Sequence, residues 1–235
     1  MTSRYRLSIV LCLAMAAILQ MAAGQTASDP PAWKRALVAA RDRQDVAALQ
    51  SLASDASPDF RRALAHSYLA EVYLELGKKD HAAATARQGI QFARKAVEMD
   101  ANDARNHYLL GALCGQVIPA SPLSALSFGQ CAREEVETAL RLDPRLPEAH
   151  LARGVGNYYL PTAFGGGLEK AEADFRNALQ FAPGWPDAHL WLGLVSRRRG
   201  NLASAREHLL RARHLAPSRE WIRIQLDKTP APSPK

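Results

Sequence analysis

Apolar residues recur along the chain at intervals of three and four positions, the spacing that places them on one face of an α-helix. Glycine, proline or an Asn-Asp pair bounds these segments, as at the ends of helices. The segments are residues 59–76, 79–99, 102–115, 122–142, 146–159, 168–181, 186–199 and 201–215. No stretch alternates apolar and polar residues as a half-buried strand does. The pattern therefore predicts an all-α protein made of antiparallel helix pairs.

Shorter helical segments flank these eight. Residues 32–40 and 45–53 are expected to form a helical hairpin inside an N-terminal cap, residues 25–58. Residues 218–228, with Trp221, Ile222 and Leu226, are expected to form a C-terminal capping helix. A stacked array needs such caps because its end repeats otherwise expose an apolar face. Residues 229–235 contain three prolines and are expected to be disordered.

Small residues and prolines repeat at a fixed frame in the second half of the chain. The last copy contains Gly193, Gly200, Ala205, Ala212 and Pro217, and 34 residues separate Pro217 from the preceding Pro183. An earlier copy, with five extra residues, contains Gly154, Ala171, Phe175, Ala178 and Pro183, and one before it, with nine extra, contains His107, Leu110, Gly111, Ala132, Val136, Ala139 and Pro144. Four histidines, His66, His107, His150 and His189, share one position of this frame.

This frame resembles the tetratricopeptide repeat (TPR) family, whose period is 34 residues. The chain departs from the family pattern in having histidine at the fourth place of each repeat, and Asn157 and Ser196 where an aromatic residue is usual. The resemblance implies an α-solenoid of about four TPR-like repeats over residues 59–217. It also implies a non-enzymatic scaffold or adaptor that binds a protein or peptide partner.

The resemblance further implies where a partner binds, because the inner face of the first helices usually forms the binding groove in TPR proteins. On this frame the face presents Arg105, Tyr108, Tyr158, Tyr159, Leu190, Leu194, Arg197 and Arg198. Tyrosine, aliphatic residues and arginine together are typical of protein interfaces. The competing interpretation is that the aromatic residues only pack within the array.

Two connections, residues 115–122 and 160–167, are longer than the repeat period requires. Both join the first helix of a repeat to its second, so they are expected on the same edge of the array. Ile118 and Phe164, followed by Gly165, Gly166 and Gly167, then either contact a partner at this loop edge or fold back onto the helices. An alternative function follows from the first option: the loops could close over a small ligand in an accessory protein of a periplasmic transport system.

The first 24 residues have the pattern of a signal peptide. Arg4 and Arg6 precede an uncharged apolar run, and Ala22, Ala23 and Gly24 supply a small-residue cleavage region. We expect cleavage near Ala23 or Gly24 and a periplasmic or secreted protein. Contact with a membrane is expected only if this segment stays uncleaved.

Charge is distributed unevenly along the 235 residues, whose formal net charge is +7. Residues 190–235 hold ten Lys or Arg against three acidic residues. This basic C-terminal repeat is suited to an acidic protein, an anionic lipid or a nucleic acid. Export makes nucleic acid the least suitable partner, and none is predicted.

The sequence contains no pattern of a metal or catalytic centre. CxxC, HExxH and GxSxG motifs are absent. A ladder of histidines at repeat spacing is too wide for a shared metal ion, so packing explains it best. We predict no metal, no cofactor and no enzymatic activity. Cys114 and Cys131, 17 residues apart, either form a disulfide or remain two buried thiols.

Overall fold

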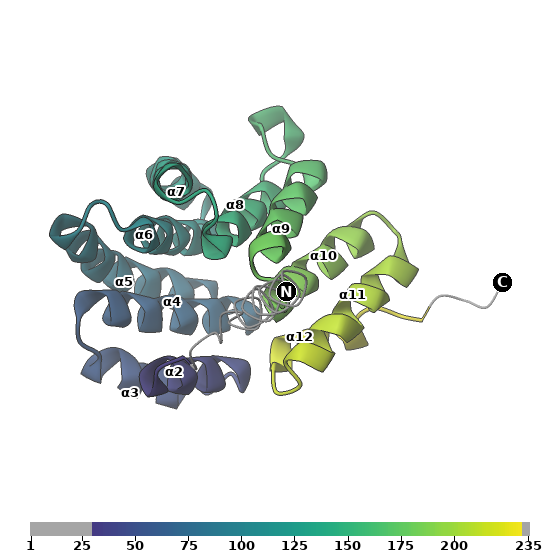
Figure 1. Cartoon of the computed structure of the whole chain (residues 1–235), viewed down its shortest axis with the longest axis horizontal. Coiled ribbons are helices and arrows are strands. Elements are labelled where there is room, and N and C mark those ends of the chain that lie inside the picture. Colours follow the sequence, from purple (N-terminus) through teal and green to yellow (C-terminus); the bar gives the residue numbers. More distant parts are fainter. Residues whose placement is uncertain (1–29, 232–235) are drawn as a thin grey trace, which may run out of the picture. The chain divides into compact units, whose positions relative to one another are not determined.

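The structure is a computed structural model that describes residues 30–231 (Figure 1). Among the described residues, 30–35 belong to one unit of the chain and 36–231 to a second, compact unit. The second unit holds all the features below except the first residues of α2.

The described residues form helices joined by short connections, with no strand among them. The fold class predicted from the apolar pattern is confirmed. The α-helices are α2 (Ala32–Asp42), α3 (Val46–Asp55), α4 (Asp59–Glu75), α5 (Lys79–Met99), α6 (Ala104–Val117), α7 (Pro122–Leu142), α8 (Pro147–Tyr159), α9 (Leu168–Phe181), α10 (Pro186–Arg198), α11 (Leu202–Leu215) and α12 (Glu220–Asp227). Two 3-10 turns, η1 (Ile118–Ala120) and η2 (Thr162–Phe164), occupy the two long connections.

Helices adjacent in sequence pack as pairs. The pairs are α4 with α5, α6 with α7, α8 with α9, and α10 with α11, and each pair contacts the next. Figure 1 shows the pairs in chain order, from blue through green to yellow. The last helix, α12, packs on α11. These contacts give the stacked helix pairs of a TPR-like α-solenoid.

Local sequence explains where the helices start and stop. Pro147 and Pro186 occupy the first turns of α8 and α10, where a missing N–H costs no helical hydrogen bond. The side chain of Asn201 accepts a hydrogen bond from the N–H of Ser204 and caps α11. Gly77 and Gly200 end α4 and α10 with φ of 74° and 80°, a left-handed conformation that suits glycine. The short turns of the first and last repeats depend on these two glycines.

Three glycines confirm the register of the repeats. Gly111, Gly154 and Gly193 each lie four residues after a histidine of the ladder. A Cβ atom at these positions would lie within 2.8 Å of a side chain on the second helix of the same repeat. Those side chains belong to Val136, Phe175 and Leu209. Glycine therefore lets the two helices of each pair approach closely.

Two of the repeated histidines, His107 and His150, hydrogen-bond to the turn that precedes their own repeat. His107 and His150 hydrogen-bond through Nε2 to the carbonyl oxygens six residues earlier, Ala101 and Pro144, both at 2.9 Å. His150 also stacks on Phe181, with ring centroids 5.6 Å apart. Each ring thus satisfies a carbonyl of the turn that enters its repeat. This accounts for histidine at the fourth place of these two repeats.

Candidate functional site

The residues predicted to line a groove lie in three different environments. They come from the first helices of the repeats, α6, α8 and α10. One group is buried beneath α12, one holds that helix in place, and one remains at the surface. Only the last group is available to a partner in this structure.

Leu190 and Leu194 form part of the core. Their exposed fractions are 1% and 5%, and they cluster with Ile222 and Leu226 of α12. In this structure the capping helix covers both leucines, so neither is open to a partner, and their predicted contact with one stays a prediction. The apolar pattern of α10 does not distinguish burial against α12 from burial against another protein.

Arg197 holds α12 in place through hydrogen bonds. Its guanidinium donates hydrogen bonds to the side chain of Gln225, at 2.7 Å, and to Oγ1 of Thr229, at 3.2 Å. The carbonyl oxygen of Thr229 accepts a further hydrogen bond from Arg206, and Thr229 is completely buried. Thr229, expected to begin a disordered tail, is therefore held in place. Residues 232–235 lie outside the described part of the chain.

At the other end of the predicted groove, Arg105 and Tyr108 occupy α6. Arg105 pairs with Asp103 at 2.6 Å, and 65% of its side chain is exposed. Tyr108 is half-buried against the cluster that contains Ala149. Burial raises the pKa of Tyr108 well above its ordinary value. Arg105 could reach a partner, whereas Tyr108 serves mainly to pack the array.

The remaining predicted residues form a compact surface patch, which we call the aromatic–arginine patch. It consists of Tyr158, Tyr159, Trp191 and Arg198. The ring centroids of Tyr158 and Tyr159 are 5.0 Å apart, and each ring meets Trp191 edge-on, at 5.4 and 6.1 Å. The Arg198 guanidinium lies 4.9 Å from the centre of the Tyr158 ring and donates a 2.7 Å hydrogen bond to the Tyr158 carbonyl oxygen.

The patch combines rigidity with exposure. Trp191 stacks on the fully buried Phe175, 5.8 Å between centroids, which anchors the cluster in the core. Tyr159, by contrast, is 66% exposed. Trp191 was not among the predicted contact residues. It lies three residues before Leu194 and seven before Arg198 on α10, and this helical spacing is the signal that could have found it.

The two long connections differ in exposure. Phe164, in η2, is 75% exposed. Gly166, two residues later, packs against the backbone of Leu160. Gly165 and Gly167 have φ of 88° and 119°, so both use conformations that suit glycine. Ile118 is half-buried, and η1 contacts α5, α6 and α7. The second connection therefore supplies an exposed aromatic residue, whereas the first folds back onto the helices.

The first two turns of α7 carry exposed apolar residues that the sequence reasoning did not single out. Leu123 and Leu126 are 73% and 81% exposed. The sequence feature that could have indicated them is the length of the helical segment, since α7 has 21 residues where α9 and α11 have 14. Cys131, further along α7, forms a disulfide with Cys114 of α6. Of the two states left open for these cysteines, the structure has the disulfide.

A buried charge cluster lies where α12 begins, and sequence reasoning missed it entirely. Its acidic members, here called the acidic site, are Asp42, Glu71, Glu75 and Asp187. Two arginines oppose them. Arg41 pairs with Asp187 at 3.0 Å. Arg219, whose side chain is completely buried, pairs with Glu71 at 2.7 Å and also with Glu75.

One sequence family matches most of the chain. The model of the family described as Regulator of microtubule dynamics protein 1-3 matches residues 39–221. The chain belongs to this family. Comparison with curated protein sequences found no match.

Several solved structures align with this family member. TTC0263, a thermophilic TPR protein of Thermus thermophilus, aligns with a TM-score of 0.56 and 20% identity, covering 84% of this chain and 98% of its own. YrrB, described as a TPR protein with an unusual peptide-binding site, aligns with a TM-score of 0.43 and 18% identity, covering 84% and 98%. MamA aligns with a TM-score of 0.40 and 17% identity, covering 86% and 96%. The likeness to TTC0263 shows the TPR-like fold.

In this member of the regulator of microtubule dynamics family, burial raises the pKa of Glu75 to about 7, with Arg219 lowering it and Glu71 raising it. The folded state therefore retains a proton that the unfolded state, with an ordinary pKa of 4.5, releases at lower pH. Stability contributed by protonated Glu75 is present below about pH 4.5 and is lost as the pH rises to about 7. Glu75→Gln mimics the protonated form and does not titrate. Its free energy of unfolding should therefore rise relative to that of the wild type as the pH increases across that range.

Urea unfolding at pH 5 and pH 8 measures this gain. Glu137→Gln, on an exposed position of α7, is the matched control, and its effect on the free energy of unfolding should be equal at both pH values. Burial is the main cause of the lowered pKa values of His66, His189 and His208. These histidines make the free energy of unfolding rise with pH, the opposite of the Glu75 effect. Their contribution is the same in every variant and cancels in the comparison. A Glu75→Gln effect that is the same at both pH values would contradict the expectation.

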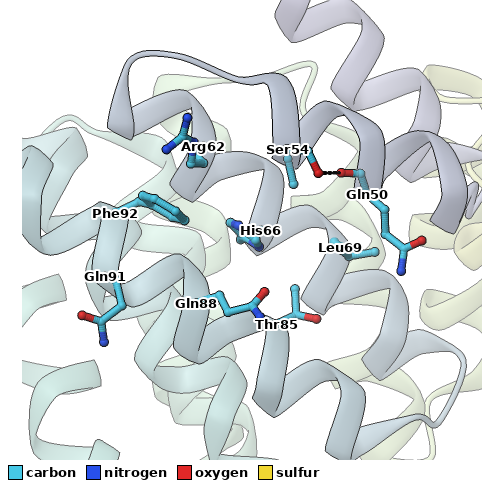
Figure 2. Close-up of a pocket in the computed structure, with 10 residues that line it drawn as sticks. Gln50, Ser54, Arg62, His66, Leu69, Thr85, Gln88, Gln91 and Phe92 are labelled. Atoms are coloured by element: carbon cyan, nitrogen blue, oxygen red, sulfur yellow. Dashed lines mark hydrogen bonds between the residues drawn. The ribbon is translucent and has the colours of Figure 1, made fainter.

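A second concave feature lies between α3, α4 and α5 (Figure 2). It is an open cavity of about 540 Å³ that none of the predicted site residues lines. His66 stacks on Phe92 at its edge, 5.4 Å between centroids, with the Arg62 guanidinium 4.8 Å from the Phe92 ring centre. Its other lining side chains are mainly uncharged: Gln50, Ser54, Leu69, Thr85, Gln88 and Gln91. The His66 and Phe92 rings therefore cover one face of each other.

Within residues 30–231, no group of three or more His, Cys, Asp and Glu is arranged to hold a metal ion. In the same range, no helix has the length and apolar character needed to cross a bilayer. The predicted signal peptide, residues 1–24, lies outside the described residues.

Proposed function

We propose that the protein is a non-enzymatic scaffold or adaptor that binds another protein through the aromatic–arginine patch. The TPR-like fold supports the general class of function, while the patch supports its location. Tyrosine, tryptophan and arginine dominate binding hot spots because they provide large contact area, stacking and charge at small entropic cost. Arg105, an exposed residue of the predicted groove, and the basic C-terminal repeat would steer an acidic partner.

The observation that carries this proposal is Tyr159, which is 66% exposed although two neighbouring rings hold it in place. A large aromatic side chain at the surface presents apolar area to water. Held rigidly, it loses little entropy when a partner covers it. The exposed Phe164 of η2 follows five residues later and would extend the contact along the loop edge.

We further propose that the protein acts outside the cytoplasm, in the periplasm or as a secreted protein. Two features support this. The first 24 residues have the pattern of a signal peptide, and the Cys114–Cys131 disulfide suits an oxidising compartment. Fusing the first 30 residues to a reporter enzyme that is active only after export tests the location directly.

The binding site is tested by placing a photo-cross-linking amino acid at Tyr159 in the source cells and identifying the captured protein. The captured protein is then purified, and its Kd is measured for the wild type and for Tyr159→Ala with Arg198→Glu. We expect binding to weaken at least about tenfold, the loss typical of a hot-spot residue. Leu142→Ala with Arg141→Glu, which changes an exposed leucine and arginine of α7 outside the basic C-terminal repeat, is the matched control and should bind normally.

The proposal fails if the captured protein binds both variants with the wild-type Kd. The family description also names one assembly to test. Co-sedimentation of the purified chain with microtubules measures that interaction, and binding that Tyr159→Ala with Arg198→Glu abolishes would place a cytoplasmic partner on the same patch. Such a result would retain the site and overturn the proposed location.

A further inference from the structure

Helix α12 contacts the acidic site as a bound peptide would. Together with Arg219, the residue that precedes its first turn, it presents three inward residues at intervals of three and four. These are Arg219, Ile222 and Leu226, with exposed fractions of 1%, 0% and 7%. Its outward face carries Arg223 and Asp227, which are exposed and pair with each other at 2.7 Å. The helix is therefore amphipathic, and one arginine accompanies its apolar stripe into the core.

The acidic site requires a cation from the start of α12. Among the described residues that precede this helix, Arg41 is the arginine that pairs with the carboxylates of Asp42, Glu71 and Asp187. Arg219 supplies the second guanidinium, from 144 residues further along the chain than Glu75. Buried carboxylates without cations are costly, so the site strongly favours an occupant that carries an arginine.

Arg219 fills the site incompletely. Its Nη atoms bond to Glu71 and Glu75, but its Nε atom is buried without a hydrogen bond. The carboxylate oxygens of Asp42 and Asp187 lie 3.6 Å from that Nε, beyond good hydrogen-bond distance. An occupant that placed its guanidinium slightly closer to them would gain interactions that α12 does not make.

The helix itself is short. α12 has eight residues, and a helix of that length is marginal in water without tertiary contacts. It follows α11 after only residues 216–219, so release requires movement of one short segment. Release would uncover Leu190 and Leu194, the inner-face leucines that α12 now covers.

We propose that the acidic site and the adjoining leucines of α10 form a binding site for an arginine-bearing amphipathic helix of a partner protein, and that α12 is its displaceable internal occupant. The ligand class follows from α12: an arginine, then aliphatic residues three and seven positions later. This proposal rests on residues other than those of the aromatic–arginine patch, although Tyr158 and Trp191 of that patch pack against the same leucine cluster.

The test uses a fluorescent synthetic peptide with the sequence of residues 217–231 as the probe. The protein is the full chain carrying Arg219→Glu and Ile222→Asp, which release α12 and leave the acidic site intact. We expect the peptide to bind this variant at least tenfold more tightly than it binds the wild-type chain, whose own α12 competes. A peptide with Arg219→Ala should lose binding, whereas one with Arg223→Ala, the outward arginine, should retain it.

Hydrogen exchange of the wild-type chain keeps the test decisive even if that variant does not fold. Excess unlabelled peptide should accelerate exchange of the α12 amides, and the Arg219→Ala peptide should not. The proposal is overturned if the folded variant does not bind the peptide, if the Arg219→Ala and Arg223→Ala peptides bind equally, or if α12 exchange stays unchanged at saturating peptide.

Discussion

Replacing Arg219 with methionine is expected to lower the free energy of unfolding by about 3–5 kcal/mol, the cost of removing one partner from a buried ion pair. Methionine keeps most of the side-chain volume, so the loss reports the charge. Arg219 is completely buried, and its removal leaves Asp42, Glu71, Glu75 and Asp187 with Arg41 alone. For a chain of this size the melting temperature should fall by roughly 6–20 °C.

Arg223→Met is the matched control for this prediction. Arg223 lies on the same helix and pairs with Glu220 and Asp227, but on the exposed face, where ion pairs contribute little. Its replacement should leave the melting temperature nearly unchanged. Equal losses for the two arginines would show that the helix, and not the buried charge, determines the effect.

Compensating changes test the cause. Adding Glu71→Gln and Glu75→Gln to Arg219→Met removes two of the unpaired carboxylates and should restore much of the lost stability. Such recovery is expected because residues of one ion-pair network couple strongly. Hydrogen exchange in the single variant should show that α12 and the C-terminal half of α4 lose protection first. Uniform loss of protection along the chain would contradict the assignment to this cluster.

Replacing Cys114 and Cys131 together with serine is expected to lower the free energy of unfolding by about 3 kcal/mol. The disulfide closes a segment with a sequence separation of 17, and the expected loss is the entropy that the unfolded chain regains. The bond joins α6 to α7 behind the exposed leucines Leu123 and Leu126. Thermal unfolding with and without a reducing agent measures the effect.

The reducing agent provides the control. The wild type should melt at a lower temperature when reduced, by roughly 6–12 °C. The double serine variant should melt at the same temperature in both conditions. A wild type insensitive to reduction, after confirmed loss of the bond, would show that packing of α6 on α7 holds this repeat without the disulfide.

The helices were largely predictable because the signals that define them are local. The segment 122–142 was predicted to the residue, and 102–115 was displaced by two residues at each end from Ala104–Val117. Proline, glycine and capping side chains act within one turn of their own position, so a single sequence displays them. The repeat register was equally visible, since Gly111, Gly154 and Gly193, which the second helices of their repeats approach, each lie four residues after a histidine.

The candidate site was only partly predictable. Tyr158, Tyr159 and Arg198 were named from the inner-face spacing, and the structure brings them together. Leu190 and Leu194 have the same spacing but are buried. An apolar stripe shows that a helix face is covered, and it does not show what covers it.

The sequence by itself determined the secondary structure, the repeat frame and the fold class, because helix signals and helix pairing depend on residues close together in the chain. Only the tertiary structure decided that α12 closes over α10 and that Arg219 meets Glu71, 148 residues away. Nothing in the neighbourhood of either residue marks the other as its partner. Burial and ion pairing are properties of the folded arrangement, and they determine which predicted surfaces remain open.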